Sequence, residues 1–196
     1  EVSRAEQALR ALGLRAGDRA AAFIPNIPET AMLALAATSQ GMVWSSCSPD
    51  FGVDGVLDRF GQIEPKVLFC ADGYRYNGET HDSLERVREI AEKLPSVRKV
   101  VVVPHLDAQV DVSDIPKAVR LDEWLRRYTP GDIAFAQLPF DHPLYILFTS
   151  GTTGKPKCIV PGAGGSLLAG LKMHKLQLDI RPGDRYFYFC TTNWVV

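Results

Sequence analysis

The sequence predicts an α/β fold, with a mostly parallel sheet and helices on both of its faces. Three observations support this prediction. Short apolar segments alternate with amphipathic segments along most of the 196 residues. The apolar segments are continuous rather than alternating, which is typical of strands that are buried on both faces. The amphipathic segments carry apolar residues at helical spacing, and this order of elements is that of α/β proteins.

The helices are predicted from apolar residues that share one face of a helical turn pattern. Ala5, Ala8, Leu9 and Leu12 are the first example. Proline and glycine mark several of the helix ends, as at Pro28. Helices are expected at residues 5–12, 28–40, 53–63, 84–94 and 121–127, and in the segment 167–178.

The strands are predicted from short apolar runs bounded by turn residues. The clearest is the β-branched run at residues 100–103. Strands are expected at residues 20–24, 42–46, 66–71, 100–103, 144–148, 157–160 and 186–190. Residues 72–81 are expected to form a polar loop, and residues 104–120 and 129–143 are expected to be irregular.

Charge and hydropathy exclude several classes of protein. The chain has 22 basic and 23 acidic residues, a balance that argues against a nucleic-acid binder. No apolar run approaches the ~18 residues that a membrane span needs, and no secretory signal is visible. We therefore expect neither nucleic acid nor a membrane as a partner.

The cysteines indicate a reducing compartment. Cys47, Cys70, Cys158 and Cys190 form no C-x-x-C pair. We expect them to be reduced, buried small hydrophobic residues in a cytoplasmic protein. No metal site is predicted, because the close spacing of zinc ligands is absent. The four scattered histidines are given no role.

Both ends of the chain look cut. The sequence does not begin with Met, and it ends in the apolar run of residues 194–196. We therefore expect a piece of a longer polypeptide.

The segment 149–157 is the most informative in the chain. It reads TSGTTGKPK and supplies four hydroxyls, two glycines and two lysines, with no acidic residue. Glycines let backbone N–H groups approach an anion closely, while hydroxyls and ammonium groups add donors and positive charge. The segment follows the predicted strand at residues 144–148 and is therefore a candidate phosphate-binding loop.

This loop is not a Walker A motif. Only two residues separate Gly151 from Gly154, and Pro156 stands where Ser or Thr is needed. Pro156 also disfavours immediate entry into a helix. On composition alone, a polar surface hairpin is an equal alternative, since Gly, Ser and Thr are ordinary turn residues.

The full pattern from Phe148 to Lys157 resembles the phosphate-loop signature of the adenylate-forming superfamily, which includes the acyl-CoA synthetases. Other stretches are more particular. Residues 44–52, 56–60 and 62–66, together with 72–78 and 138–144, closely resemble the acetoacetyl-CoA synthetase family. The resemblance covers essentially all 196 residues. It implies that residues 1–196 are part of the adenylation domain, and that the C-terminal domain of the family is absent from this sequence.

The resemblance implies a ligase that makes acetoacetyl-adenylate from acetoacetate and ATP, with Mg²⁺, and then transfers the acyl group to coenzyme A. It implies roles in lipid and ketone-body metabolism. An acetyl- or propionyl-CoA synthetase and a truncated non-catalytic module of the same fold stay open as alternatives. The piece alone is expected to be inactive, and its oligomeric state is not predicted.

The resemblance also implies site residues. Arg75 stands where relatives place an arginine near the coenzyme A phosphate, with a solvated loop arginine as the alternative. Trp194 and Val195 stand where the acyl pocket begins, with core packing as the alternative. No catalytic residue is assigned. The ATP phosphates are expected at Thr149, Ser150, Gly151, Thr152, Thr153 and Gly154, with Lys155 and Lys157 as nearby cations.

Two residues depart from the family pattern. Pro161 stands where relatives usually carry a histidine, and Asn193 stands where a glycine usually precedes the tryptophan. Pro161 removes a polar group close to the loop and is expected to stiffen the chain where it leaves the strand.

Overall fold

The computed structural model describes residues 1–149, 154–188, 190 and 191. In this described part, the main sheet has five strands in the order β2-β1-β3-β6-β7, and every neighbouring pair is parallel. This confirms the predicted fold class. The strands are β1 (Arg19–Phe23), β2 (Val43–Cys47), β3 (Val67–Ala71), β6 (Lys99–Val103) and β7 (Ala118–Arg120).

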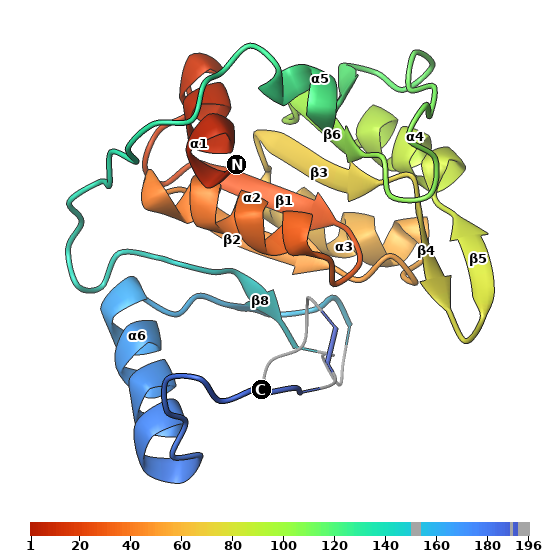
Figure 1. The fold of residues 1–196 in the computed structure, drawn as a ribbon. Coiled ribbons are helices and arrows are strands. Elements are labelled where there is room, and N and C mark those ends of the chain that lie inside the picture. The colour runs from red at the N-terminus through yellow and green to blue at the C-terminus, as the bar shows by residue number, and fades with distance from the viewer. Residues whose placement is uncertain (150–153, 189, 192–196) are drawn as a thin grey trace.

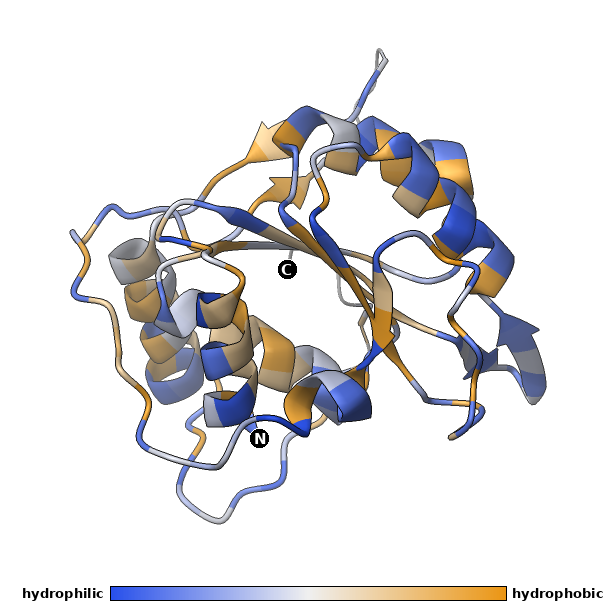
Figure 2. Ribbon diagram, turned by 90° about the horizontal axis from the view of Figure 1, so that it is seen from above, coloured by the Kyte–Doolittle hydropathy of each residue, from blue (hydrophilic) through white to orange (hydrophobic). Residues whose placement is uncertain are grey.

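Helices cover both faces of this sheet (Figure 1). One face packs against α1 (Val2–Ala11), α2 (Pro28–Ser39) and α5 (Leu121–Leu125). The other packs against α3 (Val53–Ile63) and α4 (Leu84–Lys93). Figure 2 shows hydrophobic strands at the centre and hydrophilic residues on the outer sides of the flanking helices.

Successive side chains along each strand point to opposite faces of the sheet, and this alternation divides them between two hydrophobic cores. In β3, Phe69 points to the core under α1 and α2, while Leu68 and Cys70 point to the core under α3 and α4. All three side chains are fully buried, so the strand is apolar throughout. The buried alanines of α2, Ala36 and Ala37, carry little bulk and suit close packing of that helix.

The prediction of a polar loop at residues 72–81 is wrong, because these residues form most of an antiparallel hairpin. Its strands are β4 (Gly73–Tyr76) and β5 (Glu79–Asp82). The two residues between them, Asn77 and Gly78, have φ angles of 50° and 82°. Positive φ at both positions is the signature of the type I′ turn, which Asn-Gly favours. The irregular segment expected at 104–120 likewise ends in strand β7.

The C-terminal part forms a separate hairpin and a helix. Strands β8 (Leu147–Phe148) and β9 (Cys158–Ile159) pair antiparallel. Each is shorter than the strand predicted there, at residues 144–148 and 157–160. Helix α6 (Ala163–Lys172) runs into a π-helical turn at Met173–Gln177. No residue of α6, all of which is described, is buried. The prediction of a last strand at residues 186–190 is wrong, because residues 186–188 and 190 are not in a strand.

The cysteine prediction holds in part. All four cysteines lie among the described residues and are free. Cys47 and Cys70 are buried, as expected, but Cys158 is exposed and Cys190 is only half-buried. Cys158 belongs to β9, which pairs with β8 outside the main sheet and has both of its residues exposed. In the described part of the chain, no helix is long and apolar enough to cross a membrane.

Candidate functional site

A groove lies at the carboxyl edge of the main sheet, where β1, β2 and β3 end. The strand order reverses beside β1, since β2 lies on one side of it and β3 on the other. Ligands of open α/β sheets bind at such a reversal, outside the carboxyl ends of the strands. The groove has a volume of about 370 Å³. It is lined by the segments that follow these strands and by a C-terminal segment: Pro25, Asn26, Ser48, Pro49, Asp50, Tyr74, Arg75, Tyr76, Cys190 and Thr191.

Arg75 is carried into this groove by β4, where it pairs with Thr80 of β5. The residue is exposed, and its guanidinium makes no hydrogen bond or ion pair with any residue that the structure describes. The adjacent Tyr74 ring stacks on His81, with ring centroids 4.8 Å apart. The hairpin therefore places in the groove a cation that pairs with no described residue, and a planar guanidinium binds a phosphate well.

Asp72 anchors the hairpin to the sheet. Its carboxylate is 3 % exposed and accepts hydrogen bonds from the backbone N–H groups of His105, Leu106 and Asp107, at 2.8–3.0 Å. The next residue, Gly73, has no room for a side chain, because a Cβ there would lie 2.3 Å from the carbonyl oxygen of His81. The hairpin is thus fixed against the loop that follows β6. The sequence reading assigned neither residue a role.

The candidate phosphate loop connects β8 and β9. The hairpin closes with Leu147 opposite Ile159 and Phe148 opposite Cys158. The N–H of Thr149 donates to the carbonyl oxygen of Lys157 at 3.0 Å, so these two residues form the base of the loop. The segment therefore lies between two paired strands, as predicted, and its described residues 154–157 form no helix. Predicted site residues Ser150, Gly151, Thr152, Thr153, Trp194 and Val195 lie outside the described residues.

The loop hairpin is joined to the main sheet through β2. Tyr145 forms an isolated parallel bridge with Trp44. The Trp44 N–H donates to Leu144 at 3.0 Å, and the Ile146 N–H donates back to Trp44 at 2.8 Å. The buried Ser45 hydroxyl donates to the carbonyl oxygen of Ile146 at 2.8 Å. These contacts place the loop on the β2 side of the sheet.

Helix α3 contacts the second arm of the loop. The Asp58 carboxylate lies 3.7 Å from the Lys155 ammonium group, and the side chains are 44% and 76% exposed. One turn further along α3, the Gln62 amide donates to the carbonyl oxygen of Pro156 at 3.0 Å. Solvent screens this ion pair, because the Lys155 side chain is exposed.

Pro161 does not interrupt the hairpin. The Leu144 N–H donates to its carbonyl oxygen at 3.0 Å, and Pro143 forms an antiparallel bridge with Gly162. The pairing uses the carbonyl of residue 161, which proline retains. Asn193 lies outside the described residues.

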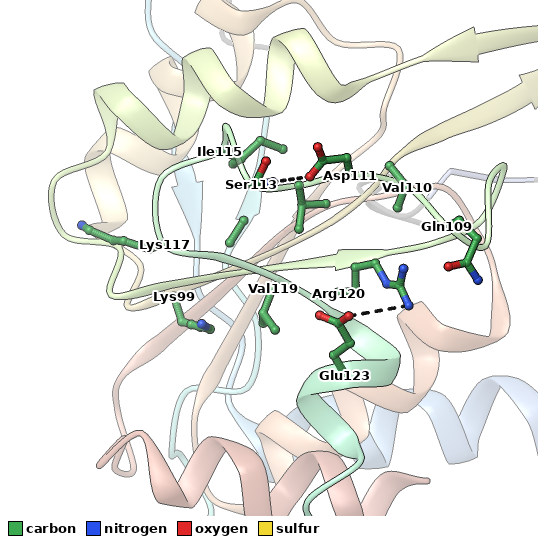
Figure 3. Close-up of a pocket in the computed structure, with 12 residues that line it drawn as sticks. Lys99, Gln109, Val110, Asp111, Ser113, Ile115, Lys117, Val119, Arg120 and Glu123 are labelled. Atoms are coloured by element: carbon green, nitrogen blue, oxygen red, sulfur yellow. Dashed lines mark hydrogen bonds and ion pairs between the residues drawn. The ribbon is translucent and has the colours of Figure 1, made fainter.

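Another cavity, of about 600 Å³, lies beside the edge strand β7 (Figure 3). The charged groups of this cavity other than Lys99 have partners within the protein. Arg120 lies 3.8 Å from Glu123, and Asp111 accepts a hydrogen bond from the Ser113 N–H at 2.9 Å. Hydrogen bonds from Ser113 lower the pKa of Asp111. The cavity extends along the edge strand from Lys99, at the amino end of β6, to Arg120, at the carboxyl end of β7.

The described residues contain no group of three or more His, Cys, Asp or Glu side chains that could hold a metal ion. The candidate site instead combines a candidate phosphate loop with a groove in which the Arg75 guanidinium pairs with no described residue. Such groups act on phosphorylated ligands by positioning them and by neutralising charge.

Comparison with known proteins gives a consistent result. The profile of the family described as AMP-binding enzyme matches residues 1–196. The acetoacetyl-coenzyme A synthetase of Rhizobium meliloti (strain 1021) is 51% identical over 196 residues, which are 100% of this chain and 30% of that protein. The acetoacetyl-CoA synthetase of Xenopus tropicalis is 44% identical over 195 residues, covering 96% of this chain and 29% of that protein.

A solved structure, that of acetoacetyl-CoA synthetase from Streptomyces lividans, superposes with a TM-score of 0.91 at 43% identity. It covers 98% of this chain and 29% of that chain. A malonamoyl-CoA synthetase of Penicillium aethiopicum, vrtB, is 40% identical over 201 residues, covering 100% of this chain and 28% of that protein. The chain thus spans about 30% of the length of the relatives it matches.

Proposed function

Since this chain belongs to the AMP-binding enzyme family, we propose that it forms part of an acid–CoA ligase that activates acetoacetate. In the first step, a carboxylate oxygen of acetoacetate attacks the α-phosphorus of ATP, and pyrophosphate leaves. In the second step, the coenzyme A thiol attacks the acyl carbon, loses its proton, and AMP leaves. Similarity to acetoacetyl-CoA synthetases at 43–51% identity supports this choice of acid.

We propose that the loop from Thr149 to Lys157 binds the ATP phosphates. The exposure of Lys155 and Lys157 and the hairpin that carries the loop support this role. Their ammonium groups would neutralise the charge that develops on the departing pyrophosphate. We propose that Mg²⁺ accompanies the ATP phosphates.

We propose that Arg75 binds the nucleotide phosphate of coenzyme A. One observation supports the proposal most directly. In a chain of the AMP-binding enzyme family, the guanidinium of Arg75 pairs with no described residue and lines a groove at the carboxyl edge of the sheet. Trp194 and Val195 are proposed to line the acyl pocket. The C-terminal domain, a cytoplasmic location and a role in lipid and ketone-body metabolism belong to the same proposal.

The test is acid-dependent exchange of pyrophosphate into ATP by the complete ligase, with acetoacetate, acetate, propionate and malonamate as substrates. We expect acetoacetate to be preferred by about tenfold or more over acetate, because a polar acyl group requires matching hydrogen bonds. Equal rates with acetate and acetoacetate would overturn the proposed specificity. Preference for malonamate would favour the activity named for the Penicillium relative.

Residues 1–196 alone are expected to form no acyl-CoA and to bind ATP weakly, because the loop supplies only one side of a nucleotide site. Calorimetric titration with ATP and an assay for AMP release test this expectation. Synthesis of acyl-CoA by residues 1–196 would contradict it.

A further inference from the structure

Arg86 lies on α4, behind the groove, and its guanidinium connects two of the groove's walls. Nη1 donates to the carbonyl oxygens of Pro49 at 2.7 Å and Phe51 at 3.3 Å. Nη2 lies 3.2 Å from the carbonyl oxygen of Asp82 and 3.3 Å from the hydroxyl of Ser83, and it donates to both. One side chain thus contacts four acceptors on two separate segments.

The two segments carry the groove. Pro49 belongs to the loop after β2 and lines the groove directly. Asp82 ends β5 and pairs with Gly73 at the root of the hairpin that carries Arg75. The separation between this loop and this hairpin therefore sets the width of the groove in which Arg75 lies.

Aromatic rings hold the guanidinium from its sides. Its central carbon lies 5.6 Å from the centroid of the Phe23 ring and 6.0 Å from that of Tyr74. Phe23 is the last residue of β1 and is buried, and Tyr74 lines the groove. Arg86 therefore contacts both walls and the carboxyl end of β1.

We propose that Arg86 is a positioning residue for the coenzyme A step: it fixes the loop after β2 and the Arg75 hairpin at the separation that the nucleotide of coenzyme A requires. The inference rests on the proposed function, in which this groove receives coenzyme A. Arg86 does not line the groove, so it acts through Pro49, Tyr74 and Arg75.

The chemistry requires arginine in particular. A guanidinium directs several N–H donors in a fixed plane, while a lysine ammonium is a single point charge that cannot reach both segments in the same geometry. Arg86→Lys keeps the charge and most of the stem, and it removes the fork that joins the two walls.

The experiment uses the complete ligase and compares its two half-reactions. Acid-dependent exchange of pyrophosphate into ATP does not involve coenzyme A, whereas thioester formation does. Arg86→Lys is compared with Arg75→Ala and with the control Arg88→Lys. Arg88 lies on the same helix but pairs with Asp114, away from the groove. Thermal unfolding of each variant is recorded alongside.

We expect Arg86→Lys to raise the KM for coenzyme A by about tenfold, because a shift of about 1 Å in a binding wall is costly. The exchange rate should stay within about twofold of the wild type, and Arg88→Lys should change neither quantity. If Arg86→Lys fails to fold, Ser83→Ala removes one acceptor and should raise the same KM by about threefold.

The outcomes separate this inference from the proposal on which it rests. If Arg75→Ala raises the KM for coenzyme A but Arg86→Lys and Ser83→Ala do not, Arg86 has no positioning role. An equal loss in both half-reactions would show that Arg86 is merely structural. If Arg75→Ala leaves the KM unchanged, the groove does not receive coenzyme A, and both the assignment of Arg75 and the inference fail.

Discussion

The walls of the groove and the hairpin of the phosphate loop are held in place in different ways. The groove walls depend on Asp72 and Arg86, which contact several backbone groups each from half-buried or buried positions. The loop hairpin is joined to the sheet through Trp44 and Ser45, and its second arm meets α3 through exposed side chains.

This difference shows that sequence specificity and structural support do not coincide. The segment 149–157 has the most recognisable sequence, yet among the described residues its contacts with the main sheet are few. The hairpin at residues 73–82 was expected to be only a polar loop, yet the buried Asp72 carboxylate fixes its root by hydrogen bonds from the backbone. Changes at the groove should therefore cost more stability than changes at the loop.

The largest expected effect is at Asp72. Asp72→Asn puts an amide group where backbone N–H groups converge, so at least one buried donor loses its acceptor. We expect the free energy of unfolding to fall by about 3 kcal/mol. Denaturation by urea, followed by the fluorescence of the core tryptophans, measures the change.

The matched control is Asp82→Asn, because the exposed side-chain carboxylate of Asp82 accepts a hydrogen bond from the Leu84 N–H alone among the described residues, at 2.8 Å. Its expected cost is below about 1 kcal/mol. Equal costs at the two positions would contradict the idea that Asp72 anchors the hairpin.

The cysteines should also distinguish the main sheet from the loop hairpin, because only the thiols of the main sheet are buried. Burial raises the pKa of Cys47 from 9.0 to about 12, although the Arg59 charge opposes the shift. The folded state therefore holds this proton more tightly than the unfolded state. The resulting stability is complete below pH 9 and is lost as pH rises toward 12, by at most about 1.4 kcal/mol per pH unit.

Comparison of urea unfolding at pH 8 and pH 10 tests this linkage, with Cys47→Ala as the control that should reduce the loss. Alkylation at pH 8 provides a second measurement. The exposed Cys158 of β9 should react at least about tenfold faster than Cys47 or Cys70. Similar rates at all three would mean that the buried thiols are accessible.

A smaller effect is expected where the loop hairpin joins β2. Ser45→Ala removes the hydroxyl that donates to Ile146, and we expect a cost of about 1 kcal/mol. Hydrogen exchange at the Ile146 amide should accelerate, while exchange at Phe69 in the central sheet should not change.

Ser39→Ala is the control for this variant, because the Ser39 hydroxyl bonds only within α2, to the carbonyl oxygen of Ala36. An unchanged Ile146 exchange rate in Ser45→Ala would show that this hydrogen bond does not hold the hairpin to the sheet.

The smallest effect is expected at the exposed pair of Asp58 and Lys155. Exposed ion pairs contribute little, so Asp58→Asn should change the free energy of unfolding by less than about 0.5 kcal/mol. Asp54→Asn on the same helix is the control. A cost above that of Ser45→Ala would reverse the order proposed for the two regions.

The sequence predicted the main sheet well because its signals are local. Continuous apolar runs identified β1, β2, β3 and β6, and helical spacing identified the helices between them. The short edge strand β7 carries no such run. The hairpin of β4 and β5 was missed although Asn77-Gly78 is a recognised type I′ turn signal.

The strand expected at residues 186–190 shows the limit of propensity. Its aromatic residues favour strands, but a strand needs a neighbouring backbone with which to pair, and residues 186–188 and 190 have none among the described residues. The roles of Arg86 and Asp72 could not be predicted either. Their partners Pro49 and His105 lie 37 and 33 residues away along the chain, and only the fold brings them together.

The order of the elements along the chain has a consequence for synthesis. The main sheet ends at Arg120, and Arg4 of α1 donates to the carbonyl oxygens of Leu125 and Tyr128 just beyond it. Chains fold from the N-terminus as they leave the ribosome. We therefore expect the sheet, with Asp72 and Arg86 already bonded, to assemble while residues 144–162 are still in the exit tunnel. The loop hairpin would then dock onto an edge strand that is already folded.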